Sequence, residues 1–192
     1  KALHITTEEF PNLTTEATLN ADYALRSASD AYSISSMWEG RTRNDYYSVN
    51  LKTGARKLLK QADYSRYRLS PEGKYAYGYC EADSVWRSID IVSGETYQIT
   101  DKSFKAWDTD NDVPDYAGSY GNGGWLAGDE YILLYDRYDI YKVPVKGGKA
   151  EKLTADGAEK KIQYRFAIAA TENGVEKARD LSKKPILTGW NE

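Results

Sequence analysis

Short runs of alternating polar and apolar residues occur along most of the sequence, and glycine, aspartate, asparagine or serine separates one run from the next. This period of two is typical of half-buried β-strands. Residues 65–79 contain two such runs around Pro71 and Gly73. These residues suit a tight turn, because proline fixes φ on entry and glycine accepts a positive φ on exit. Helical periodicity is nearly absent, so the pattern predicts an antiparallel all-β fold.

One sequence phrase occurs three times, and each copy is an alternating strand, a turn with glycine and a second strand. The copies cover residues 46–59, 89–100 and 139–154. Their turn glycines, Gly54, Gly94 and Gly147, lie 40 and 53 positions apart. A four-stranded propeller blade takes roughly 40–50 residues. We therefore predict four-stranded antiparallel blades of a β-propeller, with an inserted loop at 101–124 in the longer interval.

A hairpin of aromatic and aliphatic residues precedes each copy and would supply the inner strands of each blade; before the first copy it predicts strands at 23–25 and 31–37. The later strands expected are 161–168 and 185–188. The complete division is a lead-in at 1–20, blades at 21–60, 61–101 and 102–156, and the start of a further blade at 157–192. A closed ring needs about four to eight blades. We therefore expect an incomplete propeller, with exposed blade edges open to self-association.

Composition and charge exclude several classes of protein. The 17 tyrosines suit a half-buried sheet, where the ring packs and the hydroxyl meets water. The formal net charge of -3, without a long basic run, argues against a nucleic-acid partner. The same charge argues against an anionic membrane as a partner, and no apolar stretch approaches the roughly 18 residues that cross a bilayer. Cys80 and His4 are the single cysteine and histidine, so we expect no internal disulfide, no Cys/His metal cluster and no cofactor.

Several phrases resemble the N-terminal β-propeller of bacterial prolyl-oligopeptidase-family serine peptidases, the group that includes dipeptidyl peptidase-like enzymes. They are MWEGR (37–41), LSPEGKY (69–75), DNDVP (110–114), SYG (119–121), GW (124–125), YDRYDI (135–140) and KKPIL (183–187). The resemblance implies a propeller fragment whose partners are the rest of the propeller and an α/β-hydrolase domain in a longer parent chain. It also implies peptide substrates and a periplasmic or secreted location for the parent.

The catalytic part of such an enzyme is not found in the sequence. A nucleophile elbow reads Gly-x-Ser-x-Gly, and this pentapeptide does not occur. His4 lies in a terminal polar stretch with no nucleophile near it in sequence, so we expect no catalytic residue. By the resemblance, the chain would be a non-catalytic part of the wall or gate of a peptidase substrate chamber. The alternative is a stand-alone propeller that serves as a binding or interaction scaffold, because a fold does not fix a function.

Four side chains are candidates for contact with a substrate: Arg41, Trp107, Tyr120 and Trp125. An arginine can hold a substrate carboxylate with two hydrogen bonds. The three aromatic residues, which surround the inserted loop, could form a platform for a peptide or a sugar. The ordinary alternatives are an exposed edge charge for the arginine and packing within the sheets for the aromatic rings.

The inserted loop is also rich in oxygen ligands. Asp108, Asp110 and Asp112 are candidates for binding a hard cation such as calcium, which prefers several carboxylate and carbonyl oxygens. The loop lacks the glycine and the glutamate at the sixth and twelfth positions of an EF-hand loop. Aspartate and asparagine are also ordinary turn residues. A structural turn is the main interpretation, and a cation site is the alternative.

Overall fold

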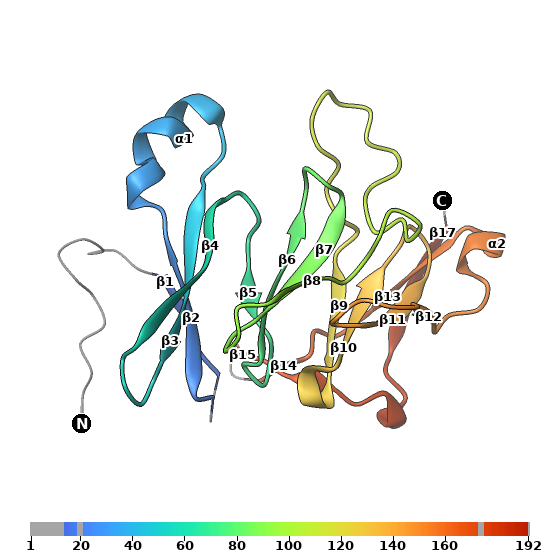
Figure 1. Ribbon diagram of the computed structural model, residues 1–192. Helices are drawn as coiled ribbons and strands as arrows, with labels where there is room; N and C mark the ends of the chain where they lie inside the picture. Colours follow the sequence, from blue (N-terminus) through green and yellow to red (C-terminus); the bar gives the residue numbers. More distant parts are fainter. Residues whose placement is uncertain (1–13, 19–20, 173–174, 192) are drawn as a thin grey trace. The chain divides into compact units, whose positions relative to one another are not determined.

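Small β-sheets make up most of the computed structural model, which describes residues 14–18, 21–172 and 175–191 (Figure 1). The chain divides into two compact units, unit 1 with residues 1–78 and 89–96 and unit 2 with residues 79–88 and 97–192. In the described ranges, no helix has both the length and the apolar character needed to cross a membrane. The predicted all-β class is confirmed.

The first sheet lies in unit 1 and follows the chain in the order β1-β2-β3-β4, with every pair antiparallel. Its strands are β1 (Thr14–Glu16), β2 (Tyr23–Ala28), β3 (Asn44–Asn50) and β4 (Arg56–Asp63). Alternation places Leu25 and Tyr46 in the core of unit 1, with 2% and 3% of their surface exposed. The Tyr46 ring meets Tyr67 edge to face at 5.1 Å, and its hydroxyl donates to the carbonyl of Ser65 at 2.8 Å. The buried phenol therefore keeps a hydrogen bond, as burial of a polar group requires.

The second sheet has the order β5-β6-β7-β8. Its strands are β5 (Arg68–Leu69), β6 (Tyr75–Cys80), β7 (Val85–Asp90) and β8 (Thr96–Gln98). The predicted hairpin around Pro71 is confirmed, because β5 and β6 pair antiparallel on either side of it. Gly73 adopts a φ of 75° and donates its N–H to the carbonyl of Ser70 at 2.9 Å. A Cβ here would lie 2.8 Å from the Cβ of Ala21, so this position requires glycine for both conformation and space.

The turns after β3 and β7 have the same hydrogen bonds, atom for atom. Oδ1 of Asn50 accepts from the backbone N–H groups two and three positions further on, and Oδ1 of Asp90 does the same. Gly54 and Gly94 have φ angles of 77° and 73°, and each donates its N–H to the backbone carbonyl of that Asn or Asp at 2.8 Å. The first two copies of the sequence phrase therefore form the same turn. In each, the side-chain oxygen of Asn or Asp accepts hydrogen bonds from the backbone of the turn and so stabilises it.

Replacing Asp90 by alanine should lower the free energy of unfolding by about 1 kcal/mol, because two backbone N–H groups lose their acceptor. Asp90→Asn should restore wild-type stability, since Asn50 makes the same two bonds in the equivalent turn. Urea unfolding followed by circular dichroism measures both changes. An Asp90→Asn protein that is as unstable as the alanine variant would disprove the equivalence.

The third sheet lies in unit 2 and has the order β12-β11-β10-β9-β16. Its strands are β9 (Asn122–Leu126), β10 (Tyr131–Tyr135), β11 (Ile140–Pro144), β12 (Glu151–Lys152) and β16 (Ala178–Arg179), and a 3₁₀ turn (Ala127–Asp129) joins β9 to β10. Its turn after β11 differs from the first two, because Gly147 donates to the carbonyl of Pro144 and no Asn or Asp side chain is available there. A Cβ on Gly147 would lie 2.5 Å from the carbonyl oxygen of Gln98. Glycine is needed here for close backbone approach as well as for its φ of 85°.

The segment predicted as a strand at 31–37 is helical, and that prediction is wrong. A 3₁₀ turn (Asp30–Tyr32) leads into α1 (Ser33–Glu39), which projects from one end of the first sheet (Figure 1). Ile34, Met37 and Trp38 have the i, i+3, i+4 spacing of a helix face. In so short a segment this spacing is hard to distinguish from the alternation of a strand. All three side chains are more than 75% exposed. The helix ends at Gly40, whose φ of 66° and N–H bond to Ser36 are typical of a glycine cap.

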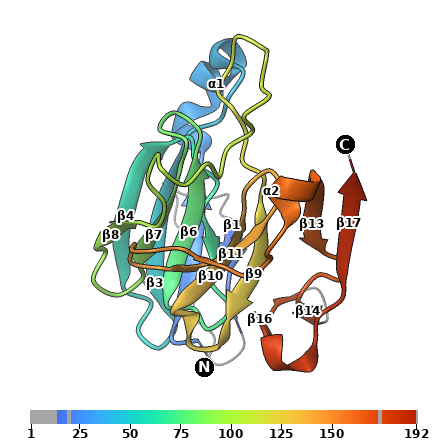
Figure 2. The ribbon, with the colours of Figure 1, turned by 90° about the vertical axis from the view of Figure 1, so that its right-hand side faces the viewer.

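The last part of unit 2 contains two small pairs of strands and a short helix. They are β13 (Ile162–Phe166) with β17 (Leu187–Asn191), β14 (Thr171–Glu172) with β15 (Val175–Glu176), and α2 (Gly157–Lys160). The two strands predicted here are present as β13 and β17, side by side in Figure 2. The prediction missed β16, which adds to the edge of β9 in parallel, opposite Trp125 and Leu126 (Figure 2). A 3₁₀ turn (Leu181–Lys183) follows it.

Candidate functional site

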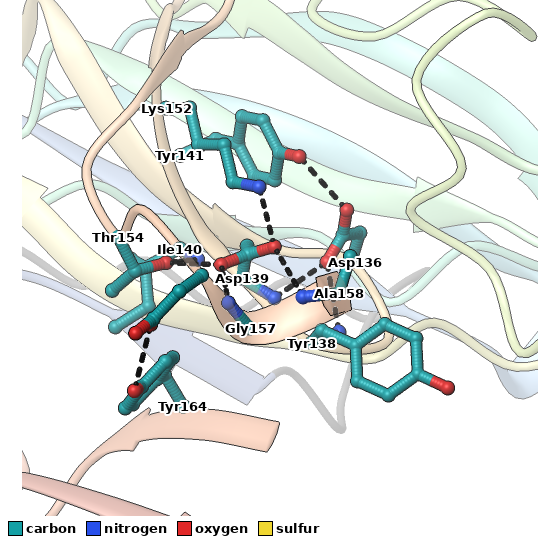
Figure 3. Close-up of polar contacts among 11 residues, drawn as sticks. Asp136, Tyr138, Asp139, Ile140, Tyr141, Lys152, Thr154, Gly157, Ala158 and Tyr164 are labelled. Carbon is teal, nitrogen blue, oxygen red and sulfur yellow. Dashed lines mark hydrogen bonds and ion pairs between the residues drawn. The ribbon is translucent and has the colours of Figure 1, made fainter. Parts of the chain in front are cut away.

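Two aspartates, Asp136 and Asp139, fix the turn between β10 and β11 (Figure 3). Oδ1 of Asp136 accepts from the backbone N–H of Tyr138 at 2.9 Å and of Asp139 at 2.6 Å. Its Oδ2 accepts from the hydroxyl of Tyr141 at 2.9 Å. Both oxygens of this carboxylate therefore accept hydrogen bonds, Oδ1 from its own turn and Oδ2 from β11.

Asp139 has no exposed surface, and it joins segments that follow it along the chain. Its Oδ1 accepts from the Thr154 hydroxyl at 2.7 Å and from the N–H of Gly157 at 3.2 Å. Its Oδ2 accepts from the N–H of Ala158 at 3.2 Å and lies 2.7 Å from Nζ of Lys152 (Figure 3). A buried carboxylate must be paired and hydrogen-bonded, and these four donors meet that need. Asp139 therefore fastens β12 and the start of α2 to the start of β11.

Tyr141 links this network to an aromatic contact. Its ring meets Phe104 edge to face at a centroid distance of 4.8 Å. Burial, followed by the negative charge of Asp136, raises the pKa of the Tyr141 phenol well above its usual range. The phenol therefore stays protonated at neutral pH and donates to the carboxylate of Asp136. Such a group is suited to structural support and not to acid or base catalysis.

A pocket of about 610 Å³ opens beside Asp136 and Tyr141 in unit 2. One wall is the end of β8 with the loop that follows it, residues 98–101 and 103–105. The other wall is formed by β11 and by the turn at 148–150. The pocket combines apolar surface at its base with charged side chains at its border.

Two arginines pack on aromatic rings near β9 and β13. The guanidinium of Arg165 lies 4.6 Å from the ring of Tyr135 and 5.9 Å from that of Tyr120, and it donates to the carbonyls of Asp136 and Arg137. The guanidinium of Arg179 lies 4.0 Å from the ring of Phe166 and donates to two backbone carbonyls. Burial lowers the pKa of both arginines. Their donors are used for holding backbone, so neither side chain resembles a free anchor for a ligand.

The structure distributes the four predicted contact residues over different environments. Arg41 is half-buried just after α1 in unit 1. Trp107 and Tyr120 are half-buried in the inserted loop of unit 2, where Trp107 bridges to Ser119 and the Tyr120 hydroxyl accepts from the N–H of Thr109. Trp125 has no exposed surface and belongs to the core under β10. The expectation that Trp125 contacts a substrate is therefore replaced by its alternative, core packing.

The three predicted cation ligands lie in different surroundings. Oδ1 of Asp110 forms an ion pair with Arg137 at 2.6 Å, and Oδ1 of Asp108 accepts from the N–H of Asp110. Asp112 is exposed. Among residues 14–18, 21–172 and 175–191, no three His, Cys, Asp or Glu side chains are grouped so as to hold a metal ion. His4, set aside as a catalytic residue, lies outside the described residues.

Sequence reasoning missed the pocket and its two walls. One signal for the turn beside the pocket is present in the sequence. Asp136 and Asp139 are two carboxylates, three positions apart, directly after a buried strand. Such residues commonly bond their own backbone. The wall that contains Phe104 lies more than 30 positions away from Tyr141 in the sequence. No local pattern could predict that these two segments meet.

Comparisons with known proteins give distant likenesses to solved structures. No family model matches the chain, and no curated protein matches it. A candidate TolB protein of Agrobacterium tumefaciens is 18% identical with a TM-score of 0.42, over 70% of this chain and 43% of that one. KlAtg21 in complex with the coiled coil of AgAtg16 is 12% identical with a TM-score of 0.43, over 83% and 47%. An acylaminoacyl peptidase of Pyrococcus horikoshii is 13% identical with a TM-score of 0.34, over 93% and 38%.

The chain thus spans less than half the length of each of these structures. At such identities and TM-scores, the likenesses carry no argument about what the chain binds or does.

Proposed function

We propose that this chain is a non-catalytic propeller segment of a prolyl-oligopeptidase-family serine peptidase, where it forms part of the wall or gate of the substrate chamber. In that position the sheets would act as a size filter that admits short peptides. The active-site serine, aspartate and histidine would belong to a hydrolase domain elsewhere in a longer chain.

The observation that carries the proposal is the repeat of one hydrogen-bonded turn in the first two sheets, at Asn50 and Asp90. Repetition of one four-stranded unit is the architecture of a propeller. The peptidase part of the proposal rests on the phrases quoted above. Two of them form structural turns: residues 69–75 make the β5–β6 hairpin, and residues 135–140 contain the aspartates that fix the β10–β11 turn. Such turns hold neighbouring antiparallel strands together, and a propeller wall is built from strands joined in this way.

A labelling experiment on the native polypeptide tests the proposal. Antibodies against the exposed segment 33–40, which contains α1, would isolate the folded protein from its source, and a fluorophosphonate probe would report an activated serine. We expect the native polypeptide to be labelled and to yield a Gly-x-Ser-x-Gly peptide by mass spectrometry. The isolated 192-residue chain should remain unlabelled and should not cleave peptides, because it has no nucleophile elbow.

Two results would overturn this proposal. A native polypeptide without labelling and without an elbow peptide would favour the stand-alone scaffold. Labelling of the isolated chain would show that it contains an activated serine of a kind that its sequence does not predict.

A further inference from the structure

We propose that the pocket beside Asp136 in unit 2 binds a small organic carboxylate that carries an aromatic or branched apolar group. The pocket is built by residues of unit 2 alone. The proposal is independent of any role in a peptidase, because it rests on the surface of the pocket itself.

The apolar part of the ligand would meet the base of the pocket. Ile99 and Val143 close this base with only 2% and 1% of their own surface exposed, so the half-buried rings beside them supply most of the accessible apolar surface. Phe104 and Tyr141 add two aromatic rings, already fixed edge to face at 4.8 Å. A pocket of about 610 Å³ is within the usual range for a small-molecule site, in which apolar lining supplies most of the contact area. The edge-to-face pair limits ring motion, so little conformational entropy would be lost on binding.

The carboxylates in the lining already have donors. Asp136 accepts two hydrogen bonds from its own turn and one from the Tyr141 hydroxyl on β11. Oδ1 of Asp101 accepts from both the N–H and the hydroxyl of Ser103, and these bonds lower the pKa of Asp101. The occupied oxygens of these two carboxylates are therefore poor acceptors for a cationic ligand.

The lysines in the lining are different. Lys105 and Lys149 are exposed side chains from opposite walls of the pocket. In the part of the chain that the structure describes, neither forms an ion pair or a hydrogen bond, whereas Lys142 and Lys152 nearby pair with Glu151 and Asp139. An ammonium group has three donors and no acceptor. The free hydrogen-bond donors in the lining therefore belong to these two ammonium groups, which favours a carboxylate at one end of the ligand.

Nuclear magnetic resonance titration of the ¹⁵N-labelled full chain tests this site with N-acetyl-L-phenylalanine as the probe. We expect chemical-shift changes concentrated at residues 98–105 and 148–150. The uncharged analogue N-acetyl-L-phenylalaninamide should bind about five- to tenfold more weakly, because it lacks the anion that two lysines would hold. Acetate should also bind more weakly, because it leaves the apolar base empty.

Substitution of the two lysines locates the charge. Lys105→Gln with Lys149→Gln should raise the Kd for the acid by about five- to tenfold and leave the Kd for the amide unchanged. The matched control is Lys161→Gln with Lys184→Gln, which removes the same charge from exposed positions outside the lining and should alter neither Kd. Circular dichroism would verify that both double variants are folded.

Three outcomes would overturn the proposal. They are equal affinity for acid and amide, shift changes centred away from the two walls, and no shift changes up to the solubility limit of the acid. The fluorophosphonate experiment above reports on a different property, so either proposal can fail while the other stands.

Discussion

Replacement of Asp139 by alanine is expected to lower the free energy of unfolding by about 3 kcal/mol, because several hydrogen-bond donors lose a buried carboxylate acceptor. The side chain has no exposed surface and accepts from a hydroxyl, two backbone N–H groups and an ammonium group. Without it, the buried N–H of Gly157 loses its acceptor, and an unsatisfied buried donor carries its full desolvation cost. Denaturant unfolding monitored by circular dichroism measures the change.

Two further variants separate this network from a simple surface ion pair. Asp139→Asn keeps the shape and one acceptor oxygen, so we expect a loss of stability intermediate between wild type and alanine. Glu151→Ala is the matched control, because it also removes a carboxylate bonded to a lysine, at 3.0 Å, but from an exposed pair. Such pairs contribute little, and the unfolding midpoint should stay close to that of the wild type. Equal effects of Asp139→Ala and Glu151→Ala would contradict the anchoring role of Asp139.

Replacement of Trp125 by alanine should cost about 3–5 kcal/mol, as expected for removing a buried tryptophan side chain. Trp125 has no exposed surface and lies on β9 opposite Ile132 of β10. Its removal leaves a cavity that the surrounding β-strands can fill only in part. Trp125→Phe keeps an aromatic ring and should cost less.

Trp38→Ala is the matched control for Trp125→Ala. Trp38 is 88% exposed on α1, so its removal should leave the urea midpoint within error of the wild type. Both variants lose one tryptophan, which makes their fluorescence changes directly comparable. If Trp125→Ala unfolds at the wild-type midpoint, its assignment to the core is wrong.

Local features of the sequence predicted most of the strands. Around Pro71 and at the turn glycines Gly54 and Gly94, the residues that determine the turn are adjacent in the chain, so their chemistry can be read directly. The same is true of β13, whose alternating residues stand between turn signals. The cation candidates in the inserted loop were interpreted mainly as turn residues, and the bond from the N–H of Asp110 to Asp108 is a turn bond of that kind.

Two kinds of feature were missed: a short helix, and contacts between residues far apart in the sequence. The helix α1 was predicted as a strand, because seven residues are too few to separate a period of 3.6 from a period of two. The partners of Asp139 lie 13 to 19 positions further along the chain, and no sequence pattern near Asp139 predicts these contacts. The burial of Trp125 could not be read from the sequence for the same reason, since burial is decided by the strands packed around a residue.

The parallel pairing of β16 with β9 has a consequence for the time at which the third sheet is completed. Ala178 stands opposite Trp125, so the edge of β9 must wait for a segment about fifty residues further along the polypeptide. Closing a loop of this length costs entropy before any contact is gained. During synthesis, the first sheet can assemble from neighbours as they leave the ribosome, whereas β9 stays open on one side until residue 179 has emerged. In this interval β9 has an open edge that can pair with another nascent chain, and the short β16 covers it late.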